Sequence, residues 1–341
     1  MNAFRLLVLL SSFSLILACS ENIKDSTVKP LILEVEDYFE NDIPFGNPDV
    51  ATPASADAQA SIGRLLFYDN RLSYNNSTSC ATCHKQSRSF SDDQALSDGL
   101  YNEKTERNSM ALVNTGYQRF IFWEGHRGHL NEHVLNPISN HLEMGMRSNE
   151  DLVEKLLTID EYKQIFEEVY LDGITEENIG KSLGRFVSAM ISYNSKFDKG
   201  SKSDFTNFNV KELRGKDLFF GKAKCGGCHR GEHFVAQWRS HANIGLDLEY
   251  ADEGSGNGEF KIPTLRNIEF TGPYMHDGRF ETLEEVIEHY SENVKDHPQL
   301  DWALNPDGLG LSETEKDDLK AFLLTLSDYD FISDHRFSNP F

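Results

Sequence analysis

Four of the five cysteines in this chain belong to two copies of one pentapeptide, Cys-x-x-Cys-His. The copies are Cys80-Ala81-Thr82-Cys83-His84 and Cys225-Gly226-Gly227-Cys228-His229. In this motif the two thiols can add across the vinyl groups of a haem, and the adjacent histidine then reaches the iron. A redox dithiol or a four-cysteine zinc site is the alternative, but a redox motif needs no trailing histidine and structural zinc pairs usually lie closer in sequence. The pattern therefore predicts two covalently bound c-type haems.

The fifth cysteine, Cys19, ends an apolar N-terminal segment. Its apolar run, 6–17, is too short to cross a bilayer as a helix, so it indicates an export signal at residues 1–19. The ending Ile16-Leu17-Ala18-Cys19 is similar to the lipobox of bacterial lipoproteins, in which the cysteine becomes the acylated first residue. An ordinary cleaved signal that leaves a free thiol is the alternative. Under either interpretation the chain is exported, and we expect it in the periplasm, anchored by lipid through Cys19.

The charge balance is strongly acidic, with 55 Asp and Glu against 33 Lys and Arg and a formal net charge of -22. This balance argues against nucleic acid and against an anionic lipid surface as partners. A basic redox protein is a more natural partner, although acidity that only keeps an exported protein soluble is the alternative. The only membrane contact expected is therefore the lipid anchor.

The elements that must position these motifs are predicted to be helices. At 175–195 apolar residues recur every three or four positions, as on the buried face of an amphipathic helix. No segment of length shows the alternation of a strand, so the predicted class is all-α with long loops. Further helices are expected from 55 to 67 and at 149–170, 210–220, 282–292 and 312–326, the last two opened by capping boxes at Thr282 with Glu285 and at Ser312 with Glu315.

One haem motif in each half indicates two cytochrome c-like haem domains in tandem. Without the leader roughly 320 residues remain, enough for two domains of ordinary size. A planar haem would supply the buried apolar mass that short helices lack, which accounts for the long loops. We expect a signal peptide at 1–19, a tether at 20–45, an N-terminal haem domain at 46–200 and a C-terminal haem domain at 205–341, with a polar link near 199–209.

Several further motifs carry a family resemblance. They are Phe122-Trp123-Glu124-Gly125, Leu130-Asn131-Glu132-His133, Pro137, Leu142-Glu143-Met144-Gly145, Phe260-Lys261-Ile262-Pro263-Thr264-Leu265-Arg266-Asn267 and Pro273-Tyr274-Met275-His276-Asp277-Gly278. Together with the paired haem motifs, they resemble the bacterial di-haem cytochrome c peroxidase superfamily, which includes the MauG proteins. The resemblance runs from about residue 55 to 330. It is specific because several spaced motifs occur in the right order.

The resemblance implies that the N-terminal haem is the peroxide site and that the C-terminal haem relays or stores electrons. By position, His84 is the proximal ligand of the first iron and His229 that of the second, and Trp123 lies between the haems. Glu143 matches a distal glutamate, which can take a proton from bound peroxide and return it to the leaving oxygen. His133 stands where the family often has glutamine, and would either add a proton-transfer group or conserve a hydrogen bond.

A calcium ion at the interface is also implied by the resemblance. Asn108 matches the side-chain ligand, and Thr271 and Pro273 match the ligands that use their backbone carbonyls. A hard cation suits such oxygen ligands together with water.

The first departure from the family pattern is Leu100. It stands sixteen residues after His84, where many di-haem peroxidases place a displaceable histidine on the first iron. The first iron is therefore expected to lack that ligand and to be open to peroxide without reductive activation. The histidines that could substitute nearby are His126, His129, His133 and His141.

The second departure is Tyr290, fourteen residues after His276, where the family supplies a methionine to the second iron. Tyrosine at this place is the MauG pattern. A phenolate favours oxidised iron, so it should lower the potential of that haem. His289 is the competing ligand, but neighbouring helical residues diverge by about 100 degrees, so only one of the two can face the iron.

These observations predict an exported di-haem peroxidase that reduces hydrogen peroxide to water with electrons from a small donor, a cytochrome c or a cupredoxin. The alternative is a MauG-like oxidase that withdraws electrons from aromatic residues of a partner protein through a high-valent di-haem state. A third interpretation is a non-catalytic di-haem electron carrier with both irons closed. Dimerisation is common in the family, so a homodimer is a further expectation.

Overall fold

The computed structural model of the protein describes residues 31–39, 55–236 and 240–341. The predicted signal peptide with Cys19, and most of the predicted tether, lie outside the described residues. Within these ranges the strands are limited to one antiparallel pair, β1 (His241–Ala242) and β2 (Phe260–Lys261). The remaining regular structure is helical, which confirms the helix-rich fold class. None of the described helices is long and apolar enough to cross a membrane.

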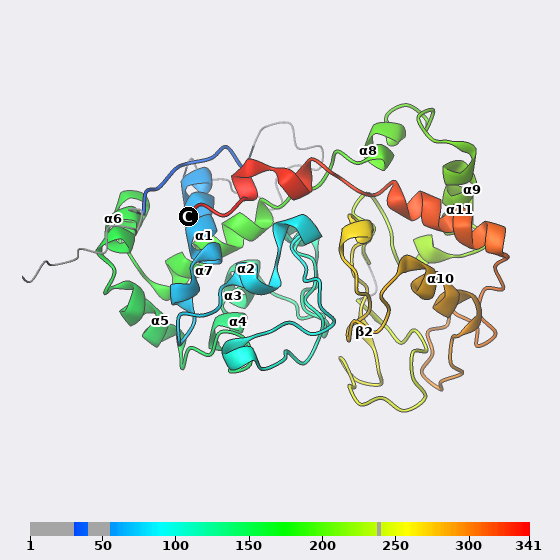
Figure 1. Cartoon of the computed structure of the whole chain (residues 1–341), viewed down its shortest axis with the longest axis horizontal. Coiled ribbons are helices and arrows are strands. Elements are labelled where there is room, and N and C mark those ends of the chain that lie inside the picture. Colours follow the sequence, from blue (N-terminus) through cyan, green and yellow to red (C-terminus); the bar gives the residue numbers. More distant parts are fainter. Residues whose placement is uncertain (1–30, 40–54, 237–239) are drawn as a thin grey trace, which may run out of the picture. The chain divides into compact units, whose positions relative to one another are not determined.

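The first core is organised by α1 (Ala56–Tyr68), which packs against α7 (Glu176–Ser188). Figure 1 shows the two helices side by side. Gly63 lies where they meet, and a Cβ atom there would come within 2.0 Å of the backbone oxygen of Ser182. Only glycine therefore allows this close approach. The buried side chains of this core include Leu66, Phe67, Phe90, Leu183 and Phe186.

Two expected helices are shorter than predicted. The segment 149–170 forms α5 (Asn149–Leu156) and α6 (Asp160–Val169), because the backbone of Ile159 is extended. The helix expected at 175–195 ends at Ser188 as α7. Beyond it, the main chain turns to Asn114, whose N–H donates to the Met190 carbonyl and whose Oδ1 accepts from the Ser192 N–H. These tertiary hydrogen bonds replace the helical ones that the sequence pattern predicted.

A second core is organised by α9 (Val210–Phe220), which packs against α11 (Glu313–Leu324), with α10 (Leu283–Glu292) also in contact with α11. Gly215 lies at the crossing, where a Cβ atom would come within 1.9 Å of the Asp318 backbone oxygen. Both predicted capping boxes are confirmed at the starts of α10 and α11. The buried side chains include Phe219, Phe234, Ile287, Phe322 and Leu326.

The C-terminal segment after α11 returns to the first core. Phe331 and Phe337 are buried there, and the red ribbon in Figure 1 passes beside α1. Arg64 of α1 donates from Nε to the Ser338 carbonyl at 2.7 Å. The end of the predicted C-terminal domain thus packs on the first core, and the exact ranges of the two haem domains stay a prediction.

Short turns punctuate the long loops. The one-turn helices are α2 (Cys80–Cys83), α3 (Leu130–His133), α4 (Asn136–Ser139) and α8 (Lys196–Ser201), the last of which overlaps the predicted link at 199–209. The 3₁₀ turns are Asn70–Leu72, Gln86–Arg88, Leu100–Asn102, Thr115–Tyr117, Cys225–Gly227, Ile268–Phe270, Phe331–Ser333 and His335–Phe337.

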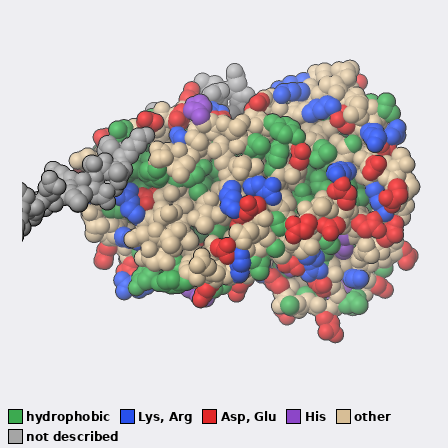
Figure 2. Space-filling view, viewed as in Figure 1, with side chains coloured by type: hydrophobic (Ala, Val, Ile, Leu, Met, Phe, Trp, Pro, Cys, Tyr) green, Lys and Arg blue, Asp and Glu red, His purple; other side chains and the backbone are tan. Residues whose placement is uncertain are grey.

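Acidic and basic side chains are interspersed on the face shown in Figure 2. Several basic groups are already paired; Lys316, for example, forms ion pairs with Glu288, Glu292 and Glu313. Since each basic group in such pairs already has an acidic partner, the remaining acidic side chains give the chain its net negative charge.

Candidate haem sites

The first Cys-x-x-Cys-His motif forms the single turn α2. Ser79 and Thr82 close a capping box at its start, which fixes the turn. Cys80 and Cys83, three residues apart on that turn, are on one face and are not joined by a disulfide. His84 donates from Nδ1 to the Phe90 carbonyl at 2.8 Å. Since a carbonyl only accepts, this bond leaves the lone pair on Nε2 for an iron.

The second motif repeats this arrangement. Cys225 and Cys228 are free thiols on a 3₁₀ turn. His229 donates from Nδ1 to the Pro263 carbonyl at 3.0 Å, with the Phe234 carbonyl at 3.3 Å. Burial lowers the pKa of His229 to about 4, so its ring is neutral at pH 7. A neutral imidazole with Nε2 unprotonated is the form that binds iron.

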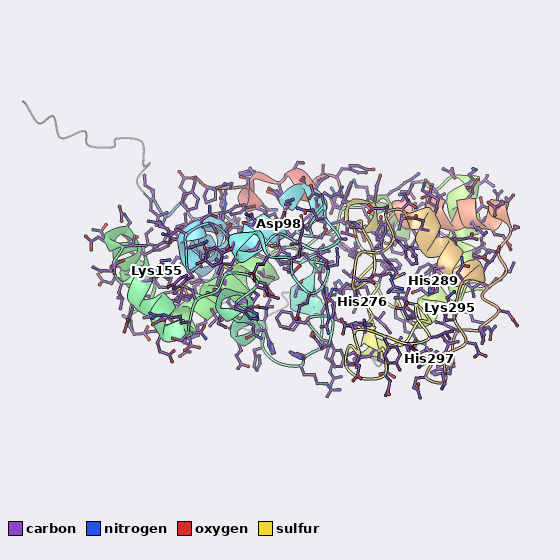
Figure 3. The ribbon with its side chains drawn as sticks, turned by 60° about the horizontal axis from the view of Figure 1, so that its bottom comes forward. Asp98, Lys155, His276, His289, Lys295 and His297 are labelled. Atoms are coloured by element: carbon purple, nitrogen blue, oxygen red, sulfur yellow. The ribbon has the colours of Figure 1, made fainter. Side chains whose placement is uncertain are left out.

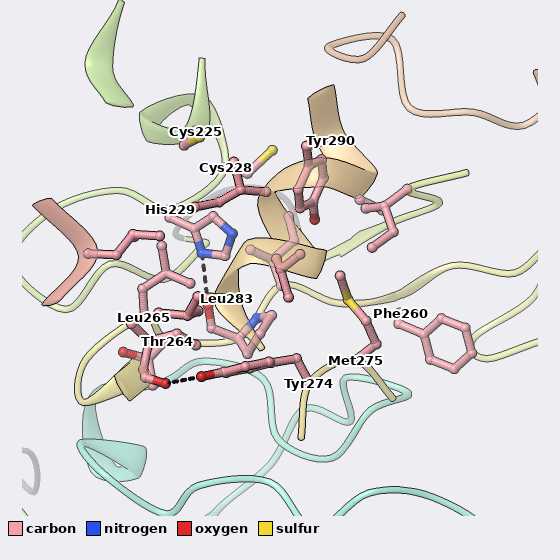
Figure 4. A pocket seen from close by; sticks show the side chains of 18 of the residues that line it. Cys225, Cys228, His229, Phe260, Thr264, Leu265, Tyr274, Met275, Leu283 and Tyr290 are labelled. Atoms are coloured by element: carbon pink, nitrogen blue, oxygen red, sulfur yellow. Dashed lines mark hydrogen bonds between the residues drawn. The ribbon is translucent and has the colours of Figure 1, made fainter. Parts of the chain in front are cut away.

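A largely apolar cavity adjoins the second motif. Cys225, Cys228 and His229 line it from one side and Tyr290 of α10 lines it from another (Figure 4). Its apolar wall includes Ala242, Ile262, Leu265, Leu283, Ile287, Leu309 and Leu323. Two thiols, one imidazole and an apolar wall are the groups that a covalently attached haem requires, so these residues fit that cofactor.

Tyr290 and His289 face different surroundings. Tyr290 lines the cavity, and burial raises the pKa of its phenol well above the usual range, with the nearby Cys225 and Cys228 adding to the effect. His289, on the same helix (Figure 3), is buried and its Nε2 donates to the Ile244 carbonyl at 3.0 Å. The geometry therefore favours Tyr290 over His289 as the group that faces a haem.

Glu143 lies near the first motif. Its half-buried carboxyl accepts a hydrogen bond from Asn140 Nδ2 at 2.8 Å. Burial raises the pKa of Glu143 above its usual range. Burial also raises the pKa of Cys80 to about 12 and that of Cys83 to about 11, and the charge of Glu143 contributes to both shifts. The structure thus brings the Glu143 carboxyl and the first Cys-x-x-Cys-His turn together.

Leu100 is buried beside the loop that carries Glu143. Its N–H donates to the Leu142 carbonyl at 3.0 Å, and its side chain closely approaches Gly145, where a Cβ atom would come within 2.4 Å of Leu100 Cδ2. Gly99 approaches the same loop, since a Cβ atom there would lie 1.8 Å from the Leu142 oxygen. A buried apolar side chain therefore occupies position 100, as the sequence shows.

The nearby histidines are mainly superficial. His126, His129 and His141 are exposed. His133 is half-buried, and its Nε2 hydrogen-bonds the Arg127 carbonyl at 3.1 Å. Its ring contacts are with Phe122 and His126. His133 is thus held within its own loop, and its proton-transfer role stays a prediction.

Trp123 connects the two halves of the described chain. Its Nε1 donates to the Asn108 carbonyl at 2.8 Å, and its own carbonyl accepts from the Lys261 N–H at 2.8 Å. The Asn108 N–H in turn donates to the His276 carbonyl at 2.7 Å. Trp123 also lines the cavity of the second motif. Its position suits a side chain that couples two haems.

The three expected calcium ligands, Asn108, Thr271 and Pro273, all line this same cavity. Asn108 is buried, and its Nδ2 donates to the carbonyls of Gln94 and Ala95. Within the described ranges no group of three or more His, Cys, Asp and Glu side chains is arranged to hold a metal ion. The expected ligands are amide and carbonyl oxygens, so they do not form a group of that kind.

Sequence reasoning missed several residues of this region. Lys261 is buried in the cavity wall, and the His276 ring stacks on that of Phe260 at 3.7 Å between centroids. Arg107 pairs with Glu124 and, at 2.6 Å, with Asp252. Lys261 and His276 stand inside motifs that were recognised in the sequence, but a motif does not show which of its polar side chains is buried.

Paired Cys-x-x-Cys-His turns with oriented imidazoles define a c-type haem protein. Residues 57–205 match the family model of the di-haem cytochrome c peroxidases. The chain is 32% identical over 282 residues to the methylamine utilization protein MauG of Methylorubrum extorquens, covering 79% of this chain and 78% of that protein. It is 33% identical over 251 residues to the cytochrome c551 peroxidase of Nitrosomonas europaea, covering 70% and 73%.

The structure is also similar to that of a MauG-like protein associated with microbial copper homeostasis, with a TM-score of 0.78 and 30% identity over 88% of this chain and 99% of that one. The chain therefore belongs to the di-haem cytochrome c peroxidase family, whose members are oxidoreductases with two haems.

Proposed function

We propose that this protein reduces hydrogen peroxide to water at a haem attached to Cys80 and Cys83, with electrons from an external donor protein. The observation that carries this proposal is the half-buried Glu143 carboxyl, whose charge acts on both thiols of the first motif. The reaction balances as one peroxide, two electrons and two protons giving two water molecules. It therefore needs a group that moves protons at the peroxide.

Glu143 is that group in this proposal. When bound, the haem supplies an iron that binds peroxide and delivers the electrons that cleave its O–O bond. His84 would hold this iron through Nε2. The Glu143 carboxylate takes a proton from one peroxide oxygen and, as the acid, returns it to the leaving oxygen. Asn140 fixes the carboxyl for both transfers through its 2.8 Å hydrogen bond.

The second haem, attached to Cys225 and Cys228, would be held by His229 and Tyr290. Trp123, which lines this cavity and belongs to the half that contains Glu143, is the side chain proposed to carry electrons between the haems. The donor is proposed to be a basic cytochrome c or cupredoxin, since charge complementarity would guide it to this acidic protein.

A second candidate function is the MauG-like oxidation of aromatic residues in a partner protein. It is favoured by Tyr290, which faces the second cavity, and by Leu100, which is buried beside Glu143. The same proton transfer by Glu143 serves both functions. They differ in whether the electrons come from a reduced donor or from a protein substrate.

The proposal includes three features of the whole protein: calcium bound by Asn108, Thr271 and Pro273, export to the periplasm with a lipid anchor at Cys19, and tandem haem domains at about 46–200 and 205–341. The burial of Asn108 in the wall of the cavity that Thr271 and Pro273 also line supports the first. The lipobox-like ending supports the second.

The deciding experiment records optical and low-temperature paramagnetic resonance spectra of the oxidised holoprotein before and after one equivalent of peroxide. One high-spin and one low-spin haem, with immediate conversion by peroxide, are expected. Rapid turnover with a reduced basic cytochrome then supports the peroxidase, whereas poor turnover with covalent oxidation of a co-purifying protein supports the MauG-like oxidase. Two low-spin haems that ignore peroxide would mean that the ligand assignment is wrong, leaving a reductively activated peroxidase or an electron carrier.

A further inference from the structure

Lys261 is a buried basic residue in the wall of the second cavity. Lys261 is only 6% exposed, and its Nζ donates a hydrogen bond to Gln118 Oε1 at 2.6 Å. Among the residues that the structure describes, no carboxylate pairs with it. Burial lowers the pKa of Lys261 to about 7. An amide oxygen satisfies one N–H but does not balance a positive charge, so a protonated Lys261 needs an anion that the described residues do not supply.

The position of Lys261 is fixed by the backbone on both sides. Lys261 pairs with His241 in the β1–β2 ladder, and the Lys261 N–H donates to the Trp123 carbonyl. Two residues further on, the Pro263 carbonyl accepts from Nδ1 of His229. One short segment therefore orients the proximal histidine and places the lysine in the same cavity. Lys261 is therefore expected to lie close to the group that His229 binds.

A haem carries two carboxylate side chains, and they are the anions that the proposed occupant of this cavity would bring. We propose that the Lys261 ammonium pairs with a carboxylate of the haem attached to Cys225 and Cys228, and so positions that haem and sets its potential. The inference rests on the proposed haem assignment. A buried positive charge beside the haem stabilises the reduced iron and thereby raises its potential, opposing the effect of a Tyr290 phenolate.

The same cavity offers a matched comparison. Lys224, next to Cys225, also lines it but is exposed to solvent. Water screens an exposed charge much more strongly than a buried one. Removing the charge of Lys261 should therefore change the midpoint potential of the second haem more than removing the charge of Lys224.

The experiment measures the midpoint potential of each haem by spectroelectrochemistry in the holoprotein. Lys261→Met, which keeps an unbranched side chain one atom shorter and removes its charge, should shift the second haem to lower potential by more than Lys224→Met does. Lys261→Arg, which keeps the charge, should have a potential close to that of the unsubstituted protein. In Lys261→Met the potential of the first haem should shift less than that of the second. A shift for Lys261→Met no larger than that for Lys224→Met would overturn the proposal.

A crystal structure of the unsubstituted holoprotein gives a test that does not depend on any variant folding. We expect Nζ of Lys261 within about 3.2 Å of a haem carboxylate oxygen. An Nζ that contacts only Gln118, or that binds the iron, would overturn the pairing. The mass of the intact protein separates the two levels of failure: two attached haems without this contact overturn the pairing alone, whereas a mass that lacks the second haem overturns the haem assignment as well.

Discussion

Glu143 is subject to two opposing influences at the scale of a single residue. Burial favours its neutral acid, while the hydrogen bond from Asn140 favours its carboxylate. Burial is the stronger influence, so the pKa of Glu143 lies above its usual range. A raised pKa makes this carboxyl a better candidate for a group that both takes up and returns a proton.

Replacement of Glu143 by Gln should slow the reaction with peroxide by roughly 10²–10⁴-fold, because the amide keeps the shape but cannot accept the proton. Stopped-flow absorbance of the oxidised holoprotein measures this rate. Glu132→Gln, at an exposed residue of α3, is the matched control and should react like the unsubstituted protein. Equal rates in both variants would remove Glu143 from the mechanism.

The pH dependence follows from the direction of the pKa shift. Burial raises the pKa of Glu143, so its carboxylate forms only at a higher pH than that of an exposed glutamate. The rate with peroxide should therefore rise with pH through this pKa and be lost as pH falls below it. A pH–rate profile that keeps the same acidic limb in Glu143→Gln would assign the limb to another group.

Tyr290→Phe should remove the second protein ligand of the second haem and change its optical and paramagnetic resonance spectra. Tyr274→Phe is the control, since Tyr274 lines the same cavity but donates its hydroxyl to the Ile268 carbonyl at 3.0 Å. Unchanged spectra in Tyr290→Phe, with both haems attached, would mean that the phenol is not a ligand.

At the scale of elements, a buried ion pair joins α8 to the segment that follows β2. Arg266, which has no exposed side chain, binds both carboxyl oxygens of Asp198 at 2.8 and 2.9 Å. Its Nε also donates to the Glu232 carbonyl. The pair therefore holds together parts of the chain that flank the second haem motif.

Removing one partner of this pair leaves the other charge buried. Arg266→Met should lower the free energy of unfolding by about 3–5 kcal/mol. The control, Arg147→Met, breaks an exposed pair with Asp151 and should cost about 1 kcal/mol or less. Urea unfolding of the two holoproteins, followed by circular dichroism, measures the difference. Equal midpoints would contradict the structural role of Arg266.

Periodicity and capping predicted the helices whose signals are local. The boxes at Thr282 and Ser312 begin α10 and α11 as expected, because each box satisfies its own helix start. The end of α7 was not predictable, since it depends on distant Asn114. The haem-attachment motifs are likewise local in sequence, so they predicted haem attachment. The burial of Lys261 beside Gln118 depends on distant parts of the chain and was seen only in the tertiary contacts.

At the scale of the whole molecule, the net charge of -22 should govern encounters with donors. Turnover with a basic cytochrome should fall by roughly tenfold as ionic strength rises from low to physiological values, because salt screens the attraction. Steady-state oxidation of reduced cytochrome across a salt series measures this. An acidic cytochrome of similar potential is the control, and its rate should rise or stay level. A basic donor that is insensitive to salt would contradict charge-guided docking.

The return of the C-terminal segment to the first core sets an order for biosynthesis. A chain that is made from its N-terminus presents the residues of the second core, up to Leu326, before Phe331 and Phe337 arrive. The half that emerges first is therefore completed last. Until the final residues arrive, Cys80 lies against an unfinished core, so we expect haem to attach most readily to the first motif during this interval.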